Sequence, residues 1–247
     1  MSKRTILVLL FLISPAIWAS EAVFIPAGTR VPFLAGANGK KTFKRDSVPV
    51  KAFWMDRYPA TMAEFAKFVR ENPEWRKSQI KSLYADSHYL DGWKDDFQFG
   101  DERNEGQAPV THVSWFAARA YCQARGKDLP TTDQWEYVAY DRGGGLGRSL
   151  DWFAQPNPAK LPPVTSASTN GFGISGLYGL IWEWTLDFSS AIPTDTDGND
   201  QFCGSGSLGA ADSSDYAAFL RYAFRTSLKA SYTTENLGFR CVTETRP

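Results

Sequence analysis

The alternation of hydrophobic and polar positions predicts helices at three places along the chain. In residues 61–73, Phe65, Phe68 and Val69 have the i, i+3, i+4 spacing of an amphipathic helix. This segment opens with the capping-box sequence TMAE and ends at an Asn-Pro pair, which is a helix stop signal. We therefore predict a first short helix here.

Two further helices are predicted in the middle of the chain. Ser114 is a favourable N-cap for a helix that runs to about Arg125, where Gly126 supplies the C-terminal stop. The sequence TTDQ, which begins at Thr131, is a second capping box and opens a helix that carries Trp135.

Strand patterns are short and scattered. Residues 23–33 and 49–57 have strand character, whereas the polar, aromatic-studded residues 75–107 are predicted to form a long surface excursion. About three short helices among short strands indicate an irregular α+β fold with little regular secondary structure. Because no linker or internal repeat interrupts residues 20–247, we expect one domain there.

The remaining pattern centres on residues 170–187, NGFGISGLYGLIWEWTLD, which contain four glycines and four aromatic residues. Glycine reaches backbone angles that other residues adopt only at a cost, so we predict a tight loop that leads into a buried strand. In an extended segment Trp182 and Trp184 point to one face and Glu183 to the other. A buried Glu183 needs backbone N–H groups or an arginine as its partner, and we interpret it as a structural acid.

Composition and missing motifs exclude several classes of function. The 27 basic and 27 acidic residues cancel, so neither nucleic acid nor an acidic membrane surface is indicated as a partner. Aromatic residues make up 15% of the chain, which predicts either a large aromatic core or a recognition groove. The sequence lacks the motifs of zinc proteases, serine hydrolases, P-loop proteins and dinucleotide-binding proteins.

The N-terminus has the features of a secretory signal. Residues 1–19 contain two basic residues and then an apolar run that is too short to span a bilayer. We expect cleavage after Ala19 or Ala22 and a periplasmic mature protein without a membrane anchor. In that oxidising compartment two of the three cysteines should pair, and the sequence leaves the choice of pair open.

An acidic segment, which contains Asp195, Asp197 and Asp200, is similar to a shortened calcium loop. It lacks the full ligand spacing and the terminal bidentate glutamate of such loops. A solvated turn is therefore favoured over a metal site.

Four segments together resemble the formylglycine-generating enzyme family, also called the sulfatase-modifying-factor domain. They are residues 53–69, 108–139, 170–187 and 236–241. They occur in the family's order across nearly all of the mature chain. The resemblance implies an irregular fold of C-type-lectin-like ancestry. It also implies a disulfide between Cys122 and Cys241, which leaves Cys203 unpaired.

The chain departs from the family pattern at positions that the family's oxidase activity requires. Family oxidases convert a target cysteine to formylglycine with two cysteines that bind copper(I), but this chain has no cysteine from Gly204 to Arg240. The family's calcium site is also weakened, since Leu180 stands where the family has asparagine. Copper and calcium are therefore cofactors by resemblance only. The candidates for a catalytic role that remain are Cys203, Ser207 and Trp184.

Three hypotheses follow. The first is a non-catalytic accessory protein, because residues 72–76, 151–156, 202–207 and 227–241 resemble the exported nitrite-reductase accessory (NirV-type) branch linked to denitrification. It would hold a periplasmic protein or peptide segment, such as a copper-containing reductase, during maturation. The second is an oxygen-dependent oxidoreductase with an altered active site that uses Cys203 and copper. The alternative interpretation of Cys203 is a buried, inert residue. The third is a sulfatase-activating enzyme, which the missing thiolate pair disfavours.

Overall fold

A computed structural model describes residues 21–30, 47–100, 105–140, 152, 155–156, 158–191 and 216–247. The predicted signal segment and the residues predicted as metal or catalytic candidates in the 195–207 region lie outside this described part. They are residues 1–19, Asp195, Asp197, Asp200, Cys203 and Ser207.

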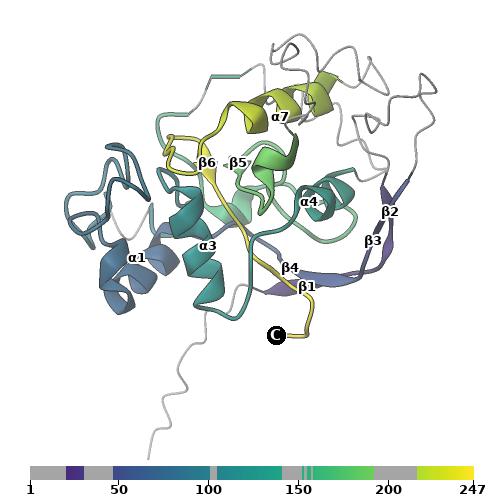
Figure 1. The fold of residues 1–247 in the computed structure, drawn as a ribbon, viewed down its shortest axis with the longest axis horizontal. Helices are drawn as coiled ribbons and strands as arrows, with labels where there is room; N and C mark the ends of the chain where they lie inside the picture. Colours follow the sequence, from purple (N-terminus) through teal and green to yellow (C-terminus); the bar gives the residue numbers. More distant parts are fainter. Residues whose placement is uncertain are drawn as a thin grey trace, which may run out of the picture.

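Within the described residues, the strands form three small sheets (Figure 1). In the largest, β4 (Phe53–Asp56) lies between β1 (Ala22–Ile25) and β7 (Val242–Thr243), and both pairings are antiparallel. The other two sheets are the antiparallel pair β2 (Gly28–Arg30) and β3 (Val48–Val50), and the parallel pair β5 (Trp182–Glu183) and β6 (Leu237–Gly238).

The described residues contain four α-helices, so the prediction of three is wrong by one. They are α1 (Met62–Glu71), α3 (Trp115–Gln123), α4 (Thr132–Ala139) and α7 (Tyr216–Ser227). The missed helix, α7, contains neither glycine nor proline, and its three alanines, one leucine and two arginines are residues that favour helix. The same described residues also contain three short 3₁₀ turns, η1 (Pro73–Trp75), η2 (Val164–Ser166) and η3 (Phe188–Ala191).

The predicted helix caps are all present. Thr61 Oγ1 accepts a hydrogen bond from Glu64 N–H at 3.3 Å, and the Glu64 carboxylate accepts from Thr61 N–H at 2.9 Å. Thr131 and Gln134 form the same reciprocal pair at the start of α4. Ser114 Oγ accepts from the third amide of α3 at 3.2 Å. These caps fix where α1, α3 and α4 begin.

The largest core cluster corrects the prediction for residues 75–107. Tyr89, Leu90, Trp93 and Phe99 are buried, so this segment is not simply a surface excursion. The Trp93 ring meets the Phe65 ring of α1 edge-on at 6.4 Å. Polar residues dominate this segment in sequence, but its few large apolar side chains gain more by covering α1 than by facing water.

The C-terminal segment closes the core. In Figure 1 it runs from β6 across the middle of the molecule to β7, shown in yellow. Cys241 forms a disulfide with Cys122 of α3, 119 residues earlier, which is the pair that the resemblance implies. A loop of this length corresponds to a stabilisation of about 4–5 kcal/mol in the chain-entropy account.

Among the helices of the described residues, none is both long enough and apolar enough to cross a membrane.

Candidate binding pocket

The site is built around β5, whose position is fixed by the C-terminal strand. Trp182 N–H donates to Asn236 O, and Trp184 N–H donates to Gly238 O. Gly238 is required at this crossing because a Cβ atom there would lie 2.3 Å from Val110 O. The two strands therefore approach closely, and β5 presents alternate side chains to different surroundings.

Glu183 forms a fully buried ion pair with Arg240. Both side chains have 0% exposure, and the shortest contact joins Arg240 Nη2 to Glu183 Oε1 at 2.7 Å. Trp135 Nε1–H of α4 donates to the same carboxylate at 2.8 Å. The remaining Arg240 donors bond backbone carbonyls, so this pair joins β4, β5 and the C-terminal segment. The network supplies the arginine partner that a buried Glu183 needs.

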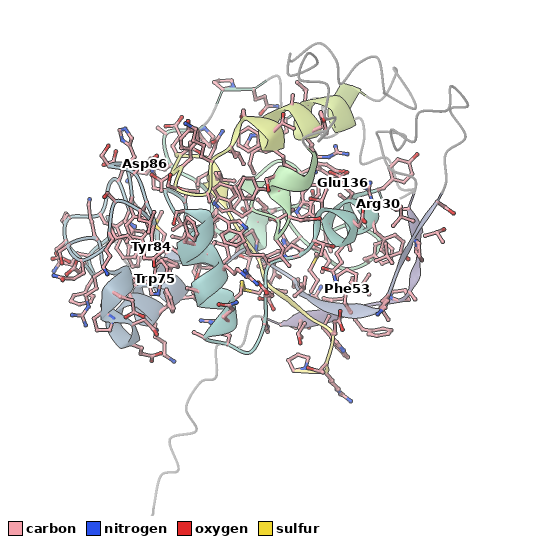
Figure 2. All side chains as sticks on the ribbon, viewed as in Figure 1. Arg30, Phe53, Trp75, Tyr84, Asp86 and Glu136 are labelled. Atoms are coloured by element: carbon pink, nitrogen blue, oxygen red, sulfur yellow. A yellow bond between two sulfur atoms is a disulfide. The ribbon has the colours of Figure 1, made fainter. Side chains whose placement is uncertain are left out.

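A second buried cluster joins α4 to α7. Glu136 accepts from Arg221 Nη2 at 2.8 Å and from Arg225 Nη1 at 2.5 Å, and Figure 2 shows Glu136 on α4 below α7. Burial by itself raises the pKa of Glu136, but the two guanidinium groups hold that pKa well below its ordinary value of 4.5. Glu136 is therefore ionised and holds both arginines.

Aromatic rings surround these charges. Arg225 lies over the Trp135 ring at 5.0 Å, and Arg221 lies over the Tyr178 ring at 5.6 Å. Trp182 stacks on Phe224 of α7 with ring centres 4.3 Å apart and an interplanar angle of 26°. These contacts align guanidinium groups and rings side by side between β5, α4 and α7.

The charges and rings line a pocket with about 310 Å³ of empty space, part of which opens to solvent. Its walls include Trp135, Trp152, Trp182, Phe224 and Arg225. Because that figure includes space open to solvent, the enclosed room is about that of one water molecule. The site is therefore a shallow depression lined by rings and charges, and a ligand would bind across its mouth.

Trp184, a predicted catalytic candidate, lies in the core. Its side chain has 0% exposure, its Nε1–H donates to Val113 O at 2.9 Å, and its ring meets Phe188 at 5.1 Å. Trp182 lines the pocket and Trp184 does not. The other candidates, Cys203 and Ser207, lie outside the described residues.

The described residues do not supply the thiolates that copper(I) would need. Within them, no three His, Cys, Asp or Glu side chains come together as a metal site. Both cysteines of this part are joined in the disulfide and offer no thiolate for copper. Asp187, which follows β5, accepts a hydrogen bond from Thr132 N–H at 2.6 Å and so supports the start of α4.

Comparison with known proteins agrees with this architecture. Residues 14–245 match the Sulfatase-modifying factor enzyme 1-like domain. The chain belongs to this family. Among relatives of this sulfatase-modifying-factor family, Inactive C-alpha-formylglycine-generating enzyme 2 of Bos taurus is 30% identical, over 78% of each chain. Formylglycine-generating enzyme of Mus musculus is 28% identical, over 92% of this chain and 76% of that relative.

A solved structure of the same fold is PvdO from Pseudomonas aeruginosa. It has a TM-score of 0.52 and 20% identity, and the match covers 91% of this chain and 94% of that chain. At this identity the likeness shows the fold alone. The family thus contains both an enzyme and a relative named inactive, and the fold does not choose between them.

Sequence reasoning missed several residues that build the pocket. Arg221 and Arg225 are four positions apart, the spacing that places two side chains on one face of a helix. That signal becomes readable only once α7 is recognised. Glu136 follows Trp135 directly, but its partners are 85 and 89 residues away and no local pattern connects them.

Proposed function

We propose that this protein is an exported accessory protein that binds a segment of a periplasmic partner and does not carry out the family's oxidase reaction. The cysteine inventory carries the proposal. The chain has three cysteines, and the disulfide uses Cys122 and Cys241. Cys203 is the single cysteine left, whereas the family reaction uses two.

The pocket supports a binding role. Large flat rings such as Trp182 and Phe224 supply contact area at low conformational cost, and aromatic residues and arginine are enriched in the centres of protein interfaces. Similarity to a relative named inactive is consistent with loss of chemistry on this fold. The partner that we propose is a copper-containing nitrite reductase, in keeping with the nitrite-reductase accessory branch.

The proposal is tested by producing such a reductase in the periplasm of a host with and without this protein. We expect higher copper content and nitrite-reducing activity of the reductase when this protein is present. Trp182→Ala should remove the effect because it opens the pocket wall. Phe24→Ala is the matched control, since Phe24 is 51% exposed and does not line the pocket. Equal reductase maturation with and without the protein would refute the partner.

The second candidate function is an oxygen-dependent oxidoreductase that uses Cys203 and copper. The similarity to a formylglycine-generating enzyme across 92% of this chain favours it. Intact mass after alkylation without reductant separates the two functions. One alkylated cysteine that copper(I) protects, together with oxygen consumption on a cysteine-containing peptide, would support the oxidase. An alkylated Cys203 that is indifferent to copper(I) would support the binding protein.

A further inference from the structure

Strand β1 is an edge strand, and its backbone groups alternate between the sheet and the outside. It pairs with β4 on one side, and β7 lies on the far side of β4 (Figure 1). Arg57 N–H donates to Glu21 O at 2.8 Å, so these two residues are a hydrogen-bonded pair of the antiparallel ladder. Such pairs alternate along a ladder, so Val23 is also bonded to β4. The N–H and C=O groups of Ala22 and Phe24 therefore point away from β4.

This outer edge lacks the features that usually protect one. Exposed sheet edges are commonly protected by a charged side chain, a proline or a bulge. The sequence of β1 is AVFI, and its register with β4 runs without interruption. Within the described part of the chain, the outer N–H and C=O groups of Ala22 and Phe24 have no hydrogen-bond partner. The Phe24 side chain is 51% exposed and its ring lies 5.3 Å from that of Trp54.

A second copy of the same strand matches this edge. When two β1 strands lie antiparallel about a two-fold axis at Val23, each Ala22 stands opposite Phe24 of the second copy. Both of these are hydrogen-bonded pairs with two bonds each, so every outer N–H and C=O group of the two strands finds a partner. On the outer face a large ring lies beside a small side chain, and on the other face the two Val23 side chains meet. The edge is therefore complementary to itself in hydrogen bonds and in shape.

The charges of the chain do not oppose such a pair. Because the 27 basic and 27 acidic residues cancel, two copies do not repel each other at long range. Glu21, which directly precedes β1, already bonds Arg57 at 3.0 and 3.1 Å. Pro26, which directly follows β1, has no N–H to donate and ends the ladder there. The edge thus fits a short and symmetric partner strand.

We infer that this protein self-associates through β1, which pairs antiparallel with β1 of a second copy and joins the two three-stranded sheets into one. Stable dimers bury about 1,600 Å² of surface, and a four-residue edge is small by comparison. We therefore expect a reversible dimer with a dissociation constant of roughly 10 μM to 1 mM. The surface is separate from the pocket, and the inference does not depend on the proposed function.

The first measurement is sedimentation velocity of the oxidised chain that begins at Ser20, over a concentration series that spans this range. We expect the mean mass to rise from monomer towards dimer. Phe24→Lys places a charge on each edge and should weaken association at least about ten-fold. Ala22→Pro removes an outer N–H but no bond to β4, and should also weaken it. Tyr140→Lys adds the same charge at a side chain that is 63% exposed and lies outside β1, so it is the matched control.

Cysteine pairing tests the register. In the inferred dimer Val23 faces Val23 of the second copy as a non-hydrogen-bonded pair, with Cα atoms about 4.5 Å apart, which is close enough for a disulfide. In a Cys203→Ser background, Val23→Cys should therefore form a covalent dimer on mild oxidation. Glu21→Cys should not, because residue 21 lies opposite residue 25 of the second copy.

Each outcome is informative. A monomer over the whole concentration series, or equal weakening by Phe24→Lys and Tyr140→Lys, would overturn the inference. Equal cross-linking of Val23→Cys and Glu21→Cys would also overturn it, because random collision and not a fixed register would then explain the dimer. The reductase-maturation assay judges the proposed function separately, so failure of one does not imply failure of the other. Thermal unfolding of each variant verifies that it is folded.

Discussion

Replacing Glu183 by glutamine should be among the most destabilising single changes in this protein. Glu183 and Arg240 are both fully buried, and all five N–H donors of Arg240 are engaged. Glutamine keeps the size of the side chain, but it removes the negative charge and turns an amide toward the donors of Arg240 and Trp135. Arg240 is then a buried cation without a counter-ion.

The magnitude follows from this geometry. Breaking a buried ion pair by removing one partner costs about 3–5 kcal/mol because the remaining charge is left uncompensated. For a chain of this size, such a loss lowers the melting temperature by roughly 10 °C. The double variant Glu183→Leu with Arg240→Met should recover a large part of the loss, because neither charge is then buried.

The assay is urea unfolding of the oxidised protein, followed by tryptophan fluorescence at neutral pH. Glu21→Gln provides the control. Its ion pair with Arg57 is exposed, with 69% of the Glu21 side chain accessible, and its loss should change the free energy of unfolding by less than about 1 kcal/mol. If Glu183→Gln loses less than about 1 kcal/mol with an unchanged denaturant slope, the reasoning is refuted.

Three further predictions concern other parts of the fold. Cys122→Ser with Cys241→Ser should lower the free energy of unfolding by about 4–5 kcal/mol in the chain-entropy account, and equal stability of oxidised wild type and variant would contradict it. Because the folded pKa of Glu136 lies below its ordinary value, its stabilisation is present above about pH 4.5 and declines as pH falls below it. In Glu136→Gln, the free energy of unfolding should therefore fall less steeply below this pH than in the wild type, which urea unfolding at a series of acid pH values would measure. Gly238→Ala should destabilise by about 2 kcal/mol or more, as its Cβ would lie 2.3 Å from Val110 O, and urea unfolding would measure this.

Local signals in the sequence predicted the parts of the fold that local chemistry decides. The capping residues Thr61, Ser114 and Thr131 mark three helix starts because each cap hydrogen bond spans only three residues. The burial of Glu183 could also be expected, since tryptophans flank it in an extended segment. Its partner Arg240 could not be read from spacing, because 57 residues separate them.

The pocket was not predicted because it depends on tertiary placement. Trp182 and Trp184 look equivalent in sequence, yet Trp184 packs in the core while Trp182 lines the pocket. What separates them is the position of α7, whose Phe224 covers Trp182. Likewise, Tyr89 and Trp93 are buried within a polar segment, because the apolar face of α1 requires a cover. Tertiary contacts override local polarity at both places.

The C-terminal segment completes the core, and this affects how the disulfide between Cys122 and Cys241 forms. Strands β6 and β7 come from the end of the chain, and Arg240 bonds a carbonyl 183 residues earlier. Such distant contacts form late, and N-terminal parts of a chain emerge first from synthesis. Until residue 241 emerges, Cys203 is the only other cysteine available to Cys122. The native bridge is therefore the product of delayed oxidation or of thiol–disulfide exchange.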